Sequence, residues 1–238
     1  MATKSGDWRD RDRQILQHIG RYRLSLRHVI EHLFFDGRSC ANVIQRLLRD
    51  GRIQSFQSVA GGLSHYELTL AEAHRQGVPL DRARGFGGQA LRTHLGVLWF
   101  CSMETKQRKR LEPPELQQLF GEHSFRAPHC AESGDHPRVL RVHIVGDKTR
   151  TRDLLKRVRS EIRKAQDNEA IAKWLRARRY GFALLVGEAA QHERLKRSVG
   201  RTGLNDSAHI VTGRVITPQN ADEIIHERSL EQKATPRS

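Results

Sequence analysis

The stretch 36–68 places the tightest constraint on the fold, because a helix-like pattern is followed directly by a hairpin-like one. Apolar residues recur at helical spacing after Ser39, which is a favourable helix N-cap. Asp50-Gly51 then supplies a typical helix stop. Polar and apolar residues alternate in 52–56 and again in 65–68, on either side of a Gly-Gly pair. This order predicts a recognition helix followed by a β-hairpin wing.

Two amphipathic patterns precede this stretch, and a further helix is expected after it. Residues 7–20 and 25–34 each carry a stripe of apolar side chains, and Ser25 is expected to start the second helix. Thr69 is expected to cap the fourth helix. Three short helices, with a tight turn between the last two, predict a helix-turn-helix, and the hairpin extends it to a winged helix. We therefore predict a winged helix-turn-helix DNA-binding domain in residues 1–78.

The outward positions of the third predicted helix carry side chains of the types that hydrogen-bond base edges and phosphates in a major groove. These positions are Arg38, Ser39, Asn42, Gln45, Arg46 and Arg49. Four polar residues of the hairpin are assigned to DNA contact by the wing: Arg52, Gln54, Gln57 and His65. An ordinary solvated helix face would have a similar composition, so the adjacent hairpin is what favours DNA binding.

The composition changes after residue 78. Pro79 and three glycines make residues 79–90 a predicted linker. The window 91–103 is strongly apolar but, at 13 residues, predicts a buried helix and not a membrane span. The basic run Lys106–Arg110 is expected to be exposed.

Residues 91–226 are predicted to form a small, non-catalytic α/β domain. Strand-like segments alternate with helix-like ones there, which favours some parallel pairing. The strand-like segments are 139–145, 182–186 and 208–216. Residues 121–137 are expected to be irregular, and residues 227–238 are expected to form a disordered tail. The predicted fold class is therefore α+β.

The charge balance predicts a polyanionic partner. The chain of 238 residues has a formal net charge of +15; residues 1–78 hold 12 basic and 8 acidic residues, whereas 148–179 hold 12 and 4. We expect double-stranded DNA and no membrane, because no apolar run approaches the roughly 20 residues of a membrane span. A helix from about 149 to 165 is expected to add sequence-independent phosphate contacts. The residues assigned to these contacts are Arg152, Lys156, Arg159 and Arg163.

Cysteine and histidine usage predicts neither disulfides nor a metal centre. The three cysteines, Cys40, Cys101 and Cys130, are widely spaced, and no signal-peptide pattern is seen, so a reducing cytoplasm is expected. A histidine-rich stretch contains His123, His129, Cys130, His136 and His143. It has no closely spaced ligand pair of the kind that zinc sites use. A phosphate-binding G-x-x-x-x-G-K-S/T motif is also missing from the sequence. No cofactor, metal or catalytic residue is therefore assigned.

The chain resembles the replication-relaxation family of plasmids and integrative conjugative elements. The matching segments include DRDRQILQHIGRYRLSLRHVIEHLFF, GRSCANVIQRLLRDGRI and SHYELTLAEA, followed by THLGVLWFCSM, VLRVHIVGDKTRTRDLLKRV and FALLVG. The resemblance extends from about residue 10 to residue 225. It implies a winged helix-turn-helix that binds DNA, with roles in plasmid replication, mobilisation or transcription control encoded by the element.

The second half of such proteins resembles a degenerate restriction-nuclease-like core. A nuclease of that type needs carboxylates that hold a divalent metal ion, including an acidic-x-Lys pair. The nearby candidates are Asp135, Asp147 and Lys148, but Asp147 and Lys148 are adjacent and lack the intervening residue. We therefore expect this domain to be non-catalytic.

These observations together favour a sequence-specific DNA-binding protein of a mobile genetic element. We expect it to regulate transcription of transfer or replication genes and not to be an enzyme. The alternative is a metal-dependent nuclease, or an accessory factor that acts with a relaxase or replication protein at an origin. Formation of a homodimer, recruitment of a relaxase, replication or transcription protein, and binding of an effector by the α/β domain are left open.

Overall fold

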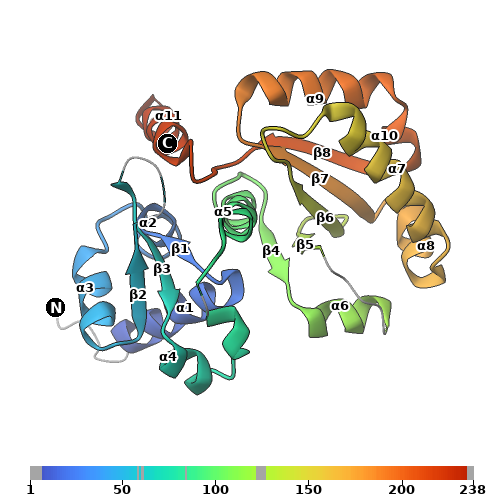
Figure 1. The fold of residues 1–238 in the computed structure, drawn as a ribbon. Helices are drawn as coiled ribbons and strands as arrows, with labels where there is room; N and C mark the ends of the chain where they lie inside the picture. The colour runs from blue at the N-terminus through green and yellow to red at the C-terminus, as the bar shows by residue number, and fades with distance from the viewer. Residues whose placement is uncertain (1–6, 58, 60–61, 84, 122–126, 235–238) are drawn as a thin grey trace. The chain divides into compact units, whose positions relative to one another are not determined.

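The computed structural model describes residues 7–57, 59, 62–83, 85–121 and 127–234. The chain forms two compact units (Figure 1). Unit 1 comprises residues 1–99 together with 216–238, and unit 2 comprises residues 100–215. Helices and sheets are mixed in the chain, which confirms the predicted α+β class. None of the described helices is long and apolar enough to cross a membrane.

Unit 1 begins with three helices and one short strand. They are α1 (Asp7–Tyr22), β1 (Ser25–Leu26), α2 (Arg27–Phe34) and α3 (Ala41–Arg49). The strand is a correction, because Ser25 does not cap α2 but is buried in β1 and pairs with Tyr66. Two residues are too few to show an alternating pattern, so the sequence gives no sign of this strand.

A hairpin completes a three-stranded antiparallel sheet in the order β1-β3-β2. Its strands are β2 (Ile53–Phe56) and β3 (His65–Leu68), and Ile53 pairs with Leu68. The hairpin therefore lies where the two alternating patterns predict it. Because β3 is the central strand, all four of its side chains are buried.

The remaining elements of unit 1 come from two parts of the sequence. They are α4 (Leu70–Arg75), the 3-10 helix η2 (Leu80–Ala83), α5 (Gly88–Ser102) and α11 (Ala221–Ala234); the last residues of α5 belong to unit 2. The prediction of a disordered tail over 227–238 is corrected for residues 227–234, which belong to α11, while 235–238 lie outside the described residues. The predicted linker 79–90 contains η2 and the first residues of α5, and it lies within unit 1.

The core of unit 1 is built from the apolar stripes of its helices and the inner side of its sheet. It includes Ile15, Leu16, Ile19, Ile30, Ile44, Leu47, Ile53 and Leu68. These residues are spaced at helical or strand periodicity, as the sequence predicts. Burial of each such side chain contributes about 1.5–3 kcal/mol to folding, so the orientation of α3 is fixed by the residues on its inner face.

Unit 2 contains a five-stranded mixed sheet in the order β4-β5-β6-β7-β8. Its strands are β4 (Arg108–Leu111), β5 (His129–Glu132), β6 (Arg138–Ile144), β7 (Tyr180–Val186) and β8 (His209–Arg214). The first three strands pair antiparallel, and β6, β7 and β8 pair parallel. The three strands predicted in this half are β6, β7 and β8, whereas β4 and β5 lie in segments predicted to be non-strand.

Helices connect the parallel strands and cover one face of the sheet (Figure 1). They are α7 (Thr151–Gln166) and α8 (Glu169–Arg176) between β6 and β7, and α9 (Ala189–Arg201) and α10 (Leu204–Ser207) between β7 and β8; α6 (Pro113–Phe120) follows β4. Leu155 and Val158 of α7 pack in one core with Phe182 and Leu184 of β7 and Leu195 of α9. Right-handed crossovers place both connections on the same side of a parallel sheet.

Candidate nucleic-acid interface

Helix α3 separates a buried face from an exposed polar face. Ile44 and Leu47 are buried in the core of unit 1. Five of the side chains predicted to contact DNA are exposed on the opposite side or in the turn before the helix: Arg38, Ser39, Asn42, Gln45 and Arg49. The helix starts later than predicted, because Cys40 and not Ser39 is its N-cap residue. The hydroxyl of Ser39 accepts weakly from the backbone N–H of Ala41 at 3.4 Å.

The turn between α2 and α3 is held by a carboxylate that the sequence patterns do not reveal. Glu31 Oε1 accepts hydrogen bonds from Arg27 Nε at 2.8 Å and from the backbone N–H of Cys40 at 3.2 Å. Arg27 also donates to the hydroxyl of Ser39 at 3.0 Å. Burial raises the pKa of the Cys40 thiol to about 12, so this thiol stays protonated at neutral pH. The start of α3 is therefore fixed by α2.

Arg46, the sixth predicted residue of the helix, has an internal role. Its Nη2 atom lies 2.7 and 2.8 Å from the two carboxylate oxygens of Asp12, which is almost fully buried on α1. A charge-assisted, doubly hydrogen-bonded pair of this kind holds its side chain in one direction. Arg46 thus joins α3 to α1, which corrects the prediction that its side chain points outward to DNA.

Arg52, predicted to contact DNA from the hairpin, instead ties the hairpin to α4. Its Nε and Nη2 atoms donate to Glu72 at 3.0 and 2.9 Å, and the Glu72 side chain is only 1% exposed. Gln76 donates to the same carboxylate at 2.7 Å, and Arg75 pairs with it as well. Burial alone would raise the pKa of Glu72, but the hydrogen bonds from Arg52 and Gln76 outweigh it and hold that pKa below its usual range.

The other three predicted wing residues differ in exposure. His65 is corrected most clearly: its side chain is 2% exposed, and its Nε2 lies 2.8 Å from Glu67 Oε1, inside the unit. Gln54 is half-buried and donates to the carbonyl of Leu68 at 3.5 Å, whereas Gln57 is exposed. The tip of the hairpin, residues 58 and 60–61, lies outside the described residues. Of the predicted wing contacts, Gln57 is therefore the one that remains fully available.

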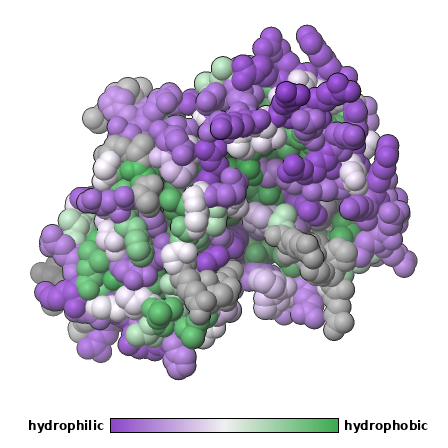
Figure 2. All heavy atoms as spheres, viewed as in Figure 1, coloured by the Kyte–Doolittle hydropathy of each residue, from purple (hydrophilic) through white to green (hydrophobic). Residues whose placement is uncertain are grey.

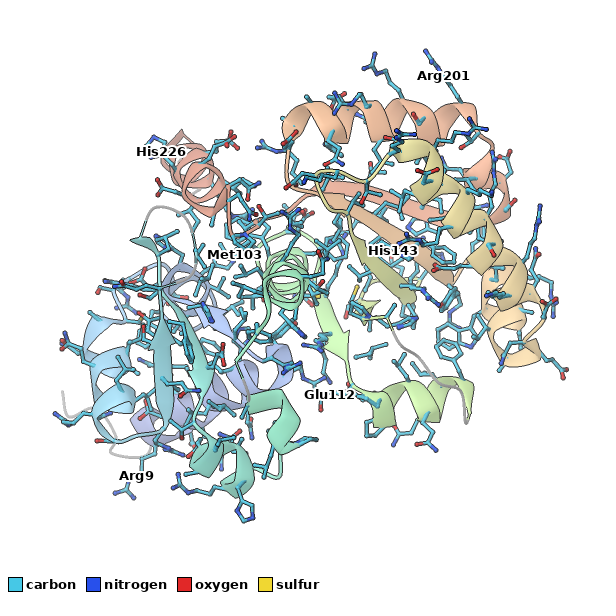
Figure 3. The ribbon with its side chains drawn as sticks, viewed as in Figure 1. Arg9, Met103, Glu112, His143, Arg201 and His226 are labelled. Carbon is cyan, nitrogen blue, oxygen red and sulfur yellow. The ribbon has the colours of Figure 1, made fainter. Side chains whose placement is uncertain are left out.

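Unit 2 carries a basic surface on the outward side of α7. The four predicted phosphate-contacting residues, Arg152, Lys156, Arg159 and Arg163, are all exposed. Arg159 also donates to the carbonyl of Thr202 at 3.2 Å. Figure 2 shows hydrophilic residues across this part of the molecule, and Figure 3 shows Arg201 pointing outward from the end of α9. Three further exposed cations on α9, which the sequence analysis does not single out, are Arg194, Lys196 and Arg197.

The residues considered for a nuclease site lie beyond opposite ends of one strand. Asp135 precedes β6, whereas Asp147 and Lys148 follow it, and all three are exposed. A seven-residue strand is roughly 23 Å long, far more than the reach of carboxylates that share one metal ion. Within the described ranges, no group of three or more His, Cys, Asp or Glu side chains is placed to hold a metal ion. Cys40, Cys101 and Cys130 are all buried and free of disulfides.

A buried polar network under α7 includes two members of the histidine-rich stretch. Glu161 Oε2 lies 2.8 Å from His143 Nε2 and 3.2 Å from Arg141 Nε (His143 is labelled in Figure 3). On the same face, His129 Nε2 and the Tyr180 hydroxyl are 2.9 Å apart. Burial lowers the pKa of His129 to about 3 and raises that of Tyr180 to about 12, so both are neutral. The network joins β5, β6 and β7 to α7.

Comparisons of the chain with protein-family models, with curated proteins and with solved structures find no match.

Proposed function

We propose that the N-terminal part of unit 1 is a winged helix-turn-helix and that the chain is a sequence-specific DNA-binding protein. The observation that carries this proposal is the exposed polar face of α3, placed between a braced turn and a three-stranded sheet with the order β1-β3-β2. A helix presented in this way fits the major groove of B-form DNA, and an adjacent hairpin can follow the backbone.

The set of residues that we propose to contact DNA bases is smaller than the sequence alone suggests. Asn42, Gln45 and Arg49 are three and four residues apart, so they share one face of α3. Asparagine and glutamine pair with adenine, and arginine pairs with guanine or a phosphate. Arg38 and Ser39, in the turn before the helix, are suited to phosphate contacts. Arg46, Arg52 and His65 form contacts inside unit 1 and need not touch DNA.

We further propose that the chain is a transcriptional regulator of a mobile element and is not an enzyme. Its resemblance to the replication-relaxation family supports this role, together with the basic surface of α7, which adds sequence-independent affinity. The separation of Asp135 from Asp147 by the length of β6 argues against a metal-dependent nuclease. Supercoiled plasmid incubated with Mg²⁺ or Mn²⁺ is expected to stay intact; nicked or linear product would revive the nuclease alternative.

Selection of bound sequences from a random double-stranded DNA library tests the reading helix. Replacing Asn42 and Gln45 by alanine is expected to reduce discrimination between selected and scrambled sites, by about 1–3 kcal/mol for each side chain that pairs with a base. Gln17→Ala, at an exposed position of α1, is the matched control and is expected to leave discrimination unchanged. Full discrimination by the Asn42/Gln45 variant would show that α3 does not read the bases.

The salt dependence of binding tests the surface on α7. Replacing Arg152, Lys156 and Arg159 by alanine is expected to weaken selected and scrambled DNA equally. It should also make the plot of log binding constant against log salt concentration less steep, by up to roughly 0.9 for each phosphate that the variant no longer neutralises. A slope equal to that of the unsubstituted protein would place the phosphate contacts elsewhere.

A further inference from the structure

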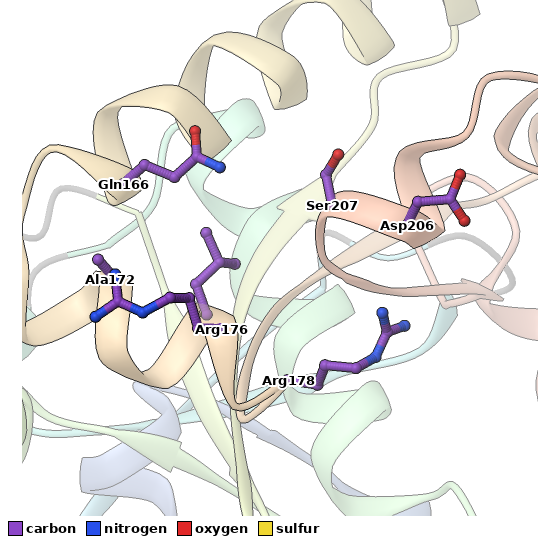
Figure 4. A pocket seen from close by; sticks show the side chains of 7 residues that line it. Gln166, Ala172, Arg176, Arg178, Asp206 and Ser207 are labelled. Atoms are coloured by element: carbon purple, nitrogen blue, oxygen red, sulfur yellow. The ribbon is translucent and has the colours of Figure 1, made fainter.

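A pocket lies in unit 2 where the C-terminal end of α8 meets α10. It has a volume of about 390 Å³ and is lined by Gln166, Ala172, Leu175, Arg176, Arg178, Asp206 and Ser207. Figure 4 shows Asp206 and Ser207 of α10 across the pocket from Arg176 and Arg178. The volume falls within the range of about 300–1,000 Å³ that is usual for small-molecule sites. The lining combines an apolar floor, two cations, a carboxylate, a hydroxyl and an amide.

The backbone at Arg178 is the feature that sets this pocket apart. Arg178 has φ +56°, and its N–H donates to Leu175 O at 3.0 Å while the N–H of Arg179 donates to Trp174 O at 2.8 Å. These two bonds form the Schellman ending of a helix, in which the left-handed position is normally glycine because a Cβ is unfavourable there. An arginine at this position carries a conformational cost, and we take this cost as a reason to look for a use of its side chain.

The charges in the pocket are available to a ligand. Arg178 Nη2 donates to the carbonyl of Asn205 at 2.9 Å, which fixes the guanidinium beside the pocket and leaves its other N–H groups unused by that bond. Arg176 is exposed, and neither Arg176 nor Asp206 forms an ion pair with any residue in the described part of the chain. Two cations suit a phosphate, and the carboxylate facing them suits hydroxyl or amino donors.

We propose that this pocket binds a nucleoside phosphate. The phosphate contacts Arg176 and Arg178, the sugar hydroxyls donate to Asp206, and the base lies over Ala172 and Leu175 within reach of the Gln166 amide. The ligand is either a free nucleotide or one nucleotide of a single strand, since both present the same groups. The proposal does not depend on DNA recognition by α3, which lies in the other unit.

Calorimetric titration of the full-length protein with AMP, GMP, CMP and UMP, each in turn, tests the site. At least one of these nucleotides, or a short single-stranded oligonucleotide, is expected to bind, and Arg176→Ala is expected to weaken that binding by tenfold or more. Lys173→Ala removes an exposed charge from the same helix outside the pocket lining and is expected to leave binding unchanged. No binding of any nucleotide or of a short single strand would overturn the proposal, and so would equal affinity for inorganic phosphate.

Arg178→Gly separates a binding role from a structural one. Glycine relieves the left-handed backbone, so the thermal midpoint of the ligand-free protein is expected to be maintained or to rise. The nucleotide affinity is expected to fall by at least tenfold in the same variant. A variant that binds normally would show that Arg178 does not contact the ligand, and one that unfolds at a clearly lower temperature would show that Arg178 has a structural role through its bond to Asn205.

Two further titrations define the ligand. Asp206→Asn is expected to reduce the preference for a ribonucleotide over its 2′-deoxy analogue, and an unchanged preference would overturn the assigned role of Asp206. Titration with a single-stranded oligonucleotide of about twelve nucleotides distinguishes a free nucleotide from a nucleotide within a strand as the ligand. Binding of the free nucleotide identifies a diffusible ligand, whereas binding of the oligonucleotide alone, abolished in Arg178→Gly, identifies a strand. Either result supports the pocket.

Discussion

A single buried carboxylate, Glu72, connects the hairpin of unit 1 to the helix that follows it. It accepts from Arg52 and Gln76, and its own backbone N–H donates to the Thr69 hydroxyl at 3.2 Å. The Thr69 hydroxyl in turn donates to the carbonyl of Gly51 at 2.7 Å. The position of the hairpin relative to α3 thus depends on a few polar contacts around one side chain.

We expect Glu72→Ala to destabilise unit 1 by about 2–4 kcal/mol, because it leaves Arg52 without its partner at a partly buried position. Urea unfolding measures this as a lower midpoint with an unchanged slope. His74→Ala, at an exposed position of the same helix, serves as the control and should shift the free energy of unfolding by no more than about 0.5 kcal/mol. Equal midpoints for the two variants would show that the Glu72 contacts contribute little.

The neutral His129 makes unit 2 sensitive to acid. Its folded-state pKa of about 3 lies below the usual value of 6.5, so the unfolded chain binds more protons between these values. The contribution of neutral His129 to stability is therefore complete above pH 6.5. It is lost as the pH falls toward 3, with a slope of up to about 1.4 kcal/mol per pH unit. We expect His129→Gln to flatten this slope in urea unfolding between pH 6.5 and 4.5. The exposed His136→Gln should retain it, and identical slopes would contradict the assignment.

At the scale of elements, strands β7 and β8 approach each other so closely that one residue must be glycine. A Cβ at Gly181 would lie 2.3 Å from the carbonyl oxygen of His209, whereas a Cβ at Gly200 in α9 would meet nothing within 4 Å. We expect Gly181→Ala to destabilise unit 2 by about 1–3 kcal/mol. Gly200→Ala, at an exposed position of α9, should stabilise it by about 0.5–1 kcal/mol. Thermal unfolding of the two variants checks the opposite signs.

Local patterns predict the elements whose periodicity is long or whose ends carry strong signals. Helix α7 and strand β7 are examples, since apolar residues recur along α7 at helical spacing and β7 is a continuous apolar run. Strand β4 could not be predicted, because its sequence RKRL looks like a solvated basic run. Arg108 is nonetheless buried, donates to Glu132 at 2.9 Å and lies 3.9 Å above the Phe100 ring. Glu132 lies 24 residues away in the sequence, so no local pattern reveals this pair.

The candidate DNA-binding site is predictable to the same extent. The outer face of α3 follows from helical spacing, which correctly predicts that Asn42 and Gln45 are exposed. The internal roles of Arg46 and Arg52 depend on Asp12 and Glu72, which lie 34 and 20 residues away in the sequence. The prediction for His65 is wrong because an alternating pattern does not show that β3 is a central strand, covered on both faces.

At the scale of the whole molecule, unit 1 is assembled from two separate parts of the chain. Residues 216–238 return to it after unit 2, where Gln219 accepts from Arg92 at 3.0 Å. The Arg228 guanidinium lies 5.9 Å from the centre of the Trp99 ring. A fragment that ends at residue 78 therefore lacks both α5 and α11.

We expect removal of residues 217–238 to lower the thermal midpoint of unit 1, because it exposes apolar surface and removes the buried side chains of Ala221, Ile224 and Ile225. The transition of unit 2 should change less. Calorimetry of the shortened and full-length chains resolves the two transitions. A shortened chain with an unaltered unit 1 transition would show that α11 contributes no stability.

The split of unit 1 also sets an order of events during synthesis. Domains usually fold in turn as the chain leaves the ribosome, but residues 216–238 emerge only after all of unit 2. The proposed DNA-binding part of unit 1 is therefore translated first, but unit 1 as a whole is completed last. During the interval, unit 1 lacks α11, so we expect the DNA binding proposed for α3 to reach its full affinity only once that helix has been made.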